Sequence, residues 1–205
     1  DVFAIAWDER EGRYLVERLE PLSNQDPSVP PPGYGVNIAF DGEGCGVIYG
    51  GDQLIAPDRA VSTSALWQIC AAPGGYRWTR IPVPSEQGGV RLARFSPIAW
   101  DPIRRRYVAA GGAFDSEAEV VFVEPGPRPE DWRVRLAPPL PTAFAERFNA
   151  YLFFDPRLGG ISLGLGGVGP IGNGEQFIQW SYVDETWRAS DVPLELGFWS
   201  RFGFA

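Results

Sequence analysis

Three arginines stand at matching places in the sequence and could together bind an anionic ligand. Arg94, Arg147 and Arg201 each directly precede a phenylalanine, and they lie 53 and 54 residues apart. If each one precedes a strand of a repeated unit, their guanidinium groups meet at one end of the molecule and offer forked donors to carboxylate or phosphate. The alternative is that each arginine pairs with a carboxylate of its own unit and acts as a structural clamp. Both interpretations remain open, and the corresponding copy at residues 33–35 has no arginine.

The two cysteines, Cys45 and Cys70, are the next candidates for chemistry. In an antiparallel hairpin the numbers of paired residues have a constant sum. Pairing Cys45 with Cys70 therefore places the centre of the hairpin in the polar loop at 52–62. The register makes the cysteines cross-strand neighbours that can form a disulfide, with two reduced core thiols as the alternative. A bridge would favour an extracellular or periplasmic location. With two thiols and no histidine, we expect no metal site.

Asp41, Asp101 and Asp155 recur just after the expected first strands and could suggest paired catalytic carboxylates. Proline follows two of them, and aspartate is a common turn former because its side chain bonds to the main chain a few residues on. We therefore predict turns rather than catalysis at these positions. The chain also contains no histidine, so the usual acid or base at neutral pH is missing. We expect no catalytic residue and no cofactor.

Several markers recur along the chain at a nearly constant period. Glycine doublets stand at 50–51, 111–112 and 166–167, in steps of 61 and 55. Aromatic residues at the expected fourth strands follow in steps of 64, 54 and 55, namely Tyr14, Trp78, Trp132 and Trp187. A fixed period with four short strands per unit is typical of β-propeller blades, so we expect an all-β fold. We interpret these tryptophans, and those at 67 and 180 on third strands, as core-packing residues.

The repeated unit resembles the kelch repeat. Its copies are YGVNIAFDGEGCGVIYGG with Trp78, RFSPIAWDPIRRRYVAAGG with Trp132, and RFNAYLFFDPRLGGISLGLGG with Trp187. The resemblance covers nearly the whole chain and implies a kelch-like or galactose-oxidase-like β-propeller. It also implies that arginines near the starts of innermost strands can capture acidic peptides. Enzymes of the galactose-oxidase type use a copper site with histidine and tyrosine ligands, which a chain without histidine cannot supply by itself.

We expect residues 1–205 to form one propeller domain with full blades at about 34–84, 94–140 and 147–193. Residues 1–33 are interpreted as a partial blade. Its hairpin at 3–20 supplies third and fourth strands, because Tyr14 aligns with the fourth-strand tryptophans, and a stiff proline-rich connector follows. Residues 197–205 restart a first strand. The chain is then a piece of a larger propeller, which we favour, or a small four-bladed ring.

Composition and charge limit the possible partners. The chain is long enough for one sizeable core, and 44% of its residues are hydrophobic. A net charge of −8 disfavours binding to nucleic acid and to anionic membranes, because both present phosphate to the protein. No apolar run approaches the roughly 20 residues that span a bilayer, so we expect no membrane insertion. The expected ligands are therefore proteins or carbohydrates.

The sequence predicts a non-catalytic binding or scaffolding module. Its ligand face would carry the long loops at 52–62 and 167–175 together with the arginines, and would take an acidic protein or a carbohydrate. One alternative is that the chain belongs to a propeller enzyme, such as a carbohydrate oxidase or lyase, whose catalytic residues lie outside this chain. Another is a structural subunit of a secreted assembly, in which a partner chain completes the propeller.

Overall fold

The structure is a computed structural model, and the part of the chain that it describes is all-β. It describes residues 2–19, 30, 33–34, 37–56, 59–63, 65–82, 96–110, 120–138, 150–165, 179–183 and 186–189. Within these ranges the chain forms antiparallel strands and one short 3-10 helix, η2 (Pro129–Asp131). The short strands follow from apolar runs that are repeatedly interrupted by glycine, proline and aspartate, which favour turns.

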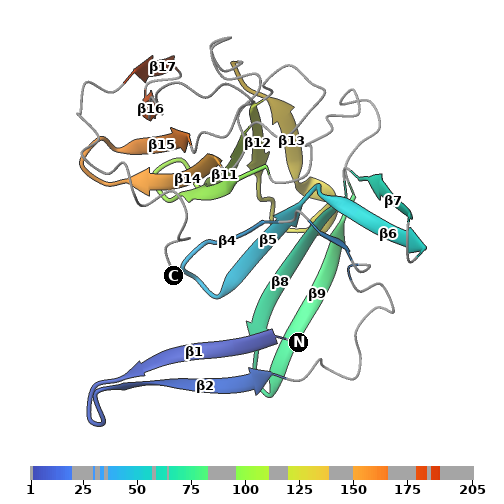
Figure 1. Cartoon of the computed structure of the whole chain (residues 1–205), viewed down its shortest axis with the longest axis vertical. Helices are drawn as coiled ribbons and strands as arrows, with labels where there is room; N and C mark the ends of the chain where they lie inside the picture. Colours follow the sequence, from blue (N-terminus) through green and yellow to red (C-terminus); the bar gives the residue numbers. More distant parts are fainter. Residues whose placement is uncertain are drawn as a thin grey trace, which may run out of the picture.

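Three four-stranded antiparallel sheets follow one another along the chain (Figure 1). Sheet I contains β4 (Ile38–Phe40), β5 (Cys45–Tyr49), β8 (Leu66–Ala72) and β9 (Gly75–Ile81). Sheet II contains β10 (Ile98–Asp101), β11 (Arg106–Ala110), β12 (Val120–Glu124) and β13 (Arg133–Leu136). Sheet III contains β14 (Ala150–Asp155), β15 (Gly160–Leu165), β16 (Gln179–Val183) and β17 (Thr186–Ala189). Each range expected to hold a four-stranded unit thus contains one such sheet, with its strands paired in chain order.

Two smaller sheets complete the described part of the chain. One is the hairpin of β1 (Val2–Asp8) and β2 (Arg13–Leu19). The other joins β3 (Gly33–Tyr34), β6 (Asp52–Ala56) and β7 (Arg59–Ser62). The segment 52–62, which we expected to be a loop, therefore forms two paired strands. Gly50 and Gly51 have φ angles of 74° and 90°, a conformation that favours glycine, and they turn the chain from sheet I into this small sheet.

The core lies in two layers, one on each face of sheet II. Tyr107 and Ala109 face sheet I, whereas Val108 and Ala110 face sheet III, and all four side chains are buried. A strand covered on both faces needs a continuous apolar run instead of an alternating one, and the sequence YVAA of β11 meets this need. The first strands of the three sheets are neighbours, because β10 contacts β4 on one side and β14 on the other. Among the described residues, none of the sheets closes on itself.

The predicted fourth-strand tryptophans all lie on the same side of their sheets. Trp132 packs between sheets II and I, and Trp187 packs between sheets III and II, so each faces the sheet that precedes its own. Trp78 alternates with the buried Ile81 on β9 and therefore lies on the face of sheet I directed away from sheet II. Trp78 and Trp187 also occupy equivalent registers. Trp132 lies two residues before the equivalent position, which Val134 occupies.

The N-terminal hairpin carries an aromatic pair across its two strands. We assigned β1 and β2 to the third and fourth strands of a partial blade because Tyr14 aligned with the later tryptophans. In the structure Trp7 lies opposite Tyr14, as Trp100 lies opposite Tyr107 in the β10–β11 hairpin. This pair resembles that of a first hairpin. Tyr182 and Trp187 also lie opposite each other in the third and fourth strands of sheet III, so our assignment of the hairpin stays a prediction.

Candidate functional site

The turns after the first strands of sheets I, II and III are organised by aspartates. In each turn the Oδ1 atom of Asp41, Asp101 or Asp155 accepts hydrogen bonds from main-chain N–H groups two to four residues later, at 2.7–3.1 Å. The prediction that these aspartates form turns is confirmed. Because these oxygens bind the main chain of their own turns, the carboxylates are poorly placed to act as a catalytic pair.

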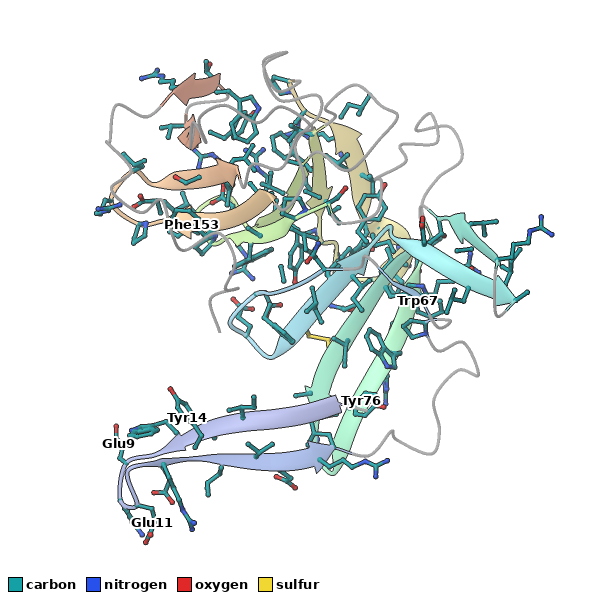
Figure 2. All side chains as sticks on the ribbon, in the orientation of Figure 1. Glu9, Glu11, Tyr14, Trp67, Tyr76 and Phe153 are labelled. Atoms are coloured by element: carbon teal, nitrogen blue, oxygen red, sulfur yellow. A yellow bond between two sulfur atoms is a disulfide. The ribbon has the colours of Figure 1, made fainter. Side chains whose placement is uncertain are left out.

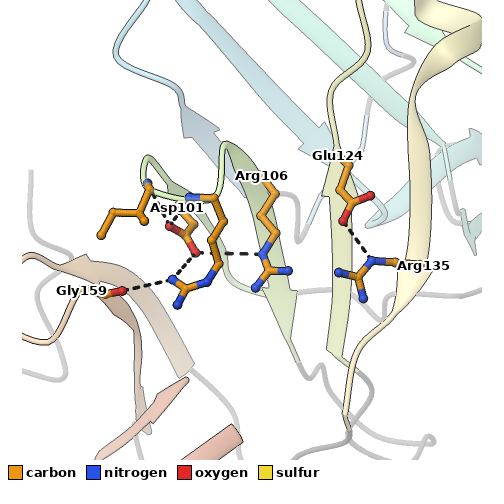
Figure 3. A network of polar contacts seen from close by, with 7 residues as sticks. Asp101, Arg106, Glu124, Arg135 and Gly159 are labelled. Carbon is orange, nitrogen blue, oxygen red and sulfur yellow. Dashed lines mark hydrogen bonds and ion pairs between the residues drawn. The ribbon is translucent and has the colours of Figure 1, made fainter. Parts of the chain in front are cut away.

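Arginines connect the turn of sheet II to the neighbouring sheets. The Arg104 Nη1 atom lies 3.2 Å from Asp101 Oδ2 and donates a hydrogen bond of 3.1 Å to the carbonyl oxygen of Gly159 in sheet III (Figure 3). On the other side, Arg105 Nη1 pairs with Glu43 Oε1 of sheet I at 3.0 Å. Both residues of the second pair are more than half exposed, so solvent and salt screen their attraction and the pair adds little stability. These contacts join the sheets at the aspartate turns.

A run of three arginines in a turn, such as residues 104–106, would ordinarily be exposed to solvent, but Arg106 is buried. Its side chain is only 4% exposed, and the central carbon of its guanidinium lies 3.7 Å from the ring centroid of Phe122 and 5.7 Å from that of Tyr182. Its Nε atom lies 4.0 Å from Asp101 Oδ2 (Figure 3). A guanidinium between aromatic faces is stabilised by cation–π attraction, so Arg106 serves the packing of sheet II on sheet III. The sequence signal for it was the Asp101–Arg106 spacing across one turn, which recurs at Asp8 and Arg13.

The turn of sheet III also contains an arginine–aspartate ion pair, between the exposed Arg157 and the buried Asp155. Arg157 donates to Asp155 Oδ2 through Nη2 at 2.9 Å, and these side-chain hydrogen bonds hold the pKa of the Asp155 carboxyl below its ordinary value. The same contact raises the pKa of Arg157. Both groups therefore keep their charges at neutral pH. In the described ranges, no group of three or more His, Cys, Asp or Glu residues could hold a metal ion.

We expect Tyr107 to make the protein sensitive to alkaline pH. Burial raises the pKa of its hydroxyl above the usual range, and the Asp41 and Glu43 carboxylates raise it further. The protonated Tyr107 hydroxyl gives its full contribution to stability below about pH 10, the ordinary pKa of tyrosine. As pH rises from there toward the raised pKa, the free energy of unfolding falls by about 1.4 kcal/mol per pH unit. Urea unfolding followed by tryptophan fluorescence between pH 9 and 11 should show a shallower decline for Tyr107→Phe.

The matched control is Tyr14→Phe, which alters a ring that is 68% exposed on the β1–β2 hairpin. It should decline with pH as the unmodified protein does. An unchanged decline in Tyr107→Phe would contradict the burial of this hydroxyl.

The cysteines form a disulfide between β5 and β8 (Figure 2). Cys45 pairs directly with Cys70, and the register continues to Tyr49 and Leu66 with the constant sum expected from the sequence. The Cα atoms of the two cysteines lie 4.0 Å apart. The predicted bridge and its register are both confirmed. The bridge lies near the end of sheet I that carries the Asp41 turn, because Asp41 accepts a hydrogen bond from the main-chain N–H of Cys45.

The predicted arginine ring lies outside the described residues. This applies to Arg94, Arg147 and Arg201, and also to the glycine doublets at 111–112 and 166–167 and the loop at 167–175. What the structure does provide is the position of the strands that follow two of the arginines. β10 begins four residues after Arg94 and β14 begins three residues after Arg147, and these two strands contact each other.

No protein-family model and no curated protein matches this chain. The kelch-like interpretation therefore stays a proposal that rests on the residues quoted above. Separately, none of the helices in the described ranges is long and apolar enough to cross a membrane.

Proposed function

We propose that this chain forms consecutive blades of a kelch-like β-propeller and acts as a non-catalytic binding or scaffolding module. The observation that carries the proposal is the series of three four-stranded sheets, packed face to face, whose first strands β4, β10 and β14 are neighbours. In a propeller the first strand of each blade lies nearest the central axis, so first strands of adjacent blades must approach one another. A two-layer sandwich would instead leave one face of every sheet uncovered, whereas sheet II is buried on both.

The ligand face in this proposal is the end of the sheets where the first strands begin. Arg94 and Arg147 directly precede that end in sheets II and III, so their guanidinium groups would come together around the axis. The arginines of the opposite end, Arg104 and Arg157, already pair with aspartates of their own turns. An acidic protein segment or an acidic carbohydrate has the charge that a pair of guanidinium groups would select.

The disulfide adds an expectation about location. Disulfides persist in oxidising compartments and are rare where thiols are kept reduced. The Cys45–Cys70 bridge therefore supports an extracellular or periplasmic site of action, where acidic glycans and exposed acidic peptides are accessible ligands.

The double variant Arg94→Ala/Arg147→Ala should lose ligand binding and keep its fold. Two probes represent the two ligand classes, a fluorescent polyglutamate peptide and a fluorescent alginate oligosaccharide. Because one hydrogen bond to a charged group contributes about 1.5–3 kcal/mol, losing two arginines should weaken binding by at least about 100-fold. Fluorescence anisotropy measures the affinity, and circular dichroism measures the melting temperature.

The control is Arg105→Ala/Arg128→Ala, which removes two arginines with 67% exposed side chains and makes the same change in net charge. It should bind like the unmodified protein. If the unmodified protein binds neither probe, the ligand proposal fails. If Arg94→Ala/Arg147→Ala unfolds, these arginines are structural clamps and the proposed face is wrong.

A further inference from the structure

The β1–β2 hairpin repeats the first hairpin of sheet II in sequence and geometry. Residues 5–14 and 98–107 both read IAWD, four turn residues, then RY. The ring centroids of Trp7 and Tyr14 lie 4.9 Å apart, and those of Trp100 and Tyr107 lie 4.6 Å apart. The repeat therefore extends beyond composition to the packing of corresponding side chains.

The turns of the two hairpins also correspond. Asp8 Oδ1 accepts hydrogen bonds from the main-chain N–H groups two and three residues later, as Asp101 Oδ1 does. The residue before each second strand is left-handed, with φ of 60° at Gly12 and 50° at Arg105. The β1–β2 hairpin is thus built as the inner half of a blade.

Corresponding side chains of the two hairpins differ completely in burial. Tyr107 is 1% exposed, whereas Tyr14 is 68% exposed. Val108 is fully buried against sheet III, whereas its counterpart Leu15 is 45% exposed. The hairpin lies beside the ends of β8 and β9 at one end of the molecule, and Tyr14 lies near its turn (Figures 1 and 2). An isolated two-stranded hairpin is marginally stable in water, so these apolar side chains require a cover.

Sheet I offers a surface of the required kind. Sheet II packs its Ala99 and Val108 onto a face of sheet III that includes Leu152, Phe154 and Trp187. The registers of the two sheets place Ile38, Phe40 and Trp78 at the equivalent positions of sheet I. Two of these side chains are open to solvent, since Ile38 is 41% exposed and Phe40 is 60% exposed.

We propose that the β1–β2 hairpin of one molecule packs its Ala6–Leu15 face onto this Ile38–Phe40 face of sheet I in a second copy. Ala6 and Leu15 form a cross-strand pair, as Ala99 and Val108 do, so the contact repeats the one between sheets II and III. The exchange is reciprocal and gives a two-fold dimer with swapped hairpins, a common route to dimers. The proposal does not depend on the ligand or on the number of blades.

A second copy fits better than the hairpin's own sheet I for two reasons. In the single molecule the hairpin does not cover this face, because Ile38 and Phe40 of its own sheet I remain exposed. In addition, residues 21–32 between β2 and β4 include five prolines, a composition that predicts a stiff, extended connector. A connector of this kind opposes folding back and favours exchange between molecules.

The test is the mass of the protein in solution by light scattering after size-exclusion chromatography. The unmodified chain should elute as a dimer of about twice 22.6 kDa. Leu15→Asp and Phe40→Lys should each elute as monomers with unchanged circular dichroism, because both side chains are exposed in the single molecule. Ile103→Asp, which alters a 62% exposed residue of the β10–β11 turn, is the matched control and should remain dimeric.

Mixing Leu15→Asp with Phe40→Lys provides a second readout. In a swapped heterodimer one interface is native and the other places the introduced carboxylate against the introduced ammonium group, so the mixture should form dimers that neither variant forms alone. The proposal is overturned if the unmodified protein is a monomer. This includes a monomer whose hairpin resists trypsin cleavage at Arg10 and Arg13, because the hairpin would then be packed within its own molecule. A dimer that Leu15→Asp and Phe40→Lys leave intact also overturns it.

Discussion

Replacement of Phe122 by alanine is expected to destabilise the protein by about 3–5 kcal/mol. The ring is fully buried between sheets II and III, with its centroid 5.3 Å from that of Tyr182. Two guanidinium groups lie over it, from Arg106 at 3.7 Å and from Arg135 at 4.6 Å. Truncation therefore creates a cavity and also removes the aromatic face that stabilises a buried cation.

Urea unfolding monitored by circular dichroism measures this loss. The control is Phe153→Ala on β14, because that ring is 39% exposed and its truncation should cost only about 1 kcal/mol. If the two variants lose equal stability, sheets II and III do not pack on each other as the structure has them. The expected loss is a large fraction of the total stability of a domain of this size.

Removing the disulfide with Cys45→Ala/Cys70→Ala should cost about 3–4 kcal/mol, since a bridge that closes a loop of this length restricts the unfolded chain by about that amount. The two cysteines are 25 residues apart and join β5 to β8, the two central strands of sheet I. The loss should appear as a lower urea midpoint with little change in the far-ultraviolet spectrum.

A comparison under reducing conditions isolates the contribution of the bridge. With dithiothreitol present, the unmodified protein and the double alanine variant should unfold at nearly the same urea concentration. Mass spectrometry after alkylation with iodoacetamide, without reductant, should show an unlabelled native chain. Labelling at both Cys45 and Cys70 would contradict the disulfide.

The three four-stranded sheets and the cysteine register could be predicted because both depend on local pattern. Each sheet is a meander whose strands pair in chain order, so apolar runs and turn residues identify the partners directly. The same reasoning predicted the turn-forming role of Asp41, Asp101 and Asp155. These predictions needed no knowledge of how one sheet lies against another.

The errors arose where a local signal had two possible meanings. Tyr14 has the spacing of a fourth-strand aromatic, and it also lies opposite Trp7 as Tyr107 lies opposite Trp100. Residues 52–62 look like a polar loop, yet they pair with one another and with Gly33–Tyr34 in a separate sheet. Arg106 stands in a run of arginines that suggests a solvated turn, although its side chain is buried.

The sequence by itself determined the all-β class, the order of strands within each sheet, the turns and the register that places the two cysteines opposite each other, because these follow from the alternation of side chains and the preferences of turn residues. The tertiary structure decided which faces are covered. It buried Arg106 between aromatic rings, enclosed sheet II on both sides, and left the apolar face of the β1–β2 hairpin exposed. The physical reason is that alternation in a strand separates two faces without specifying what packs against either, and burial depends on contacts between residues distant in the chain.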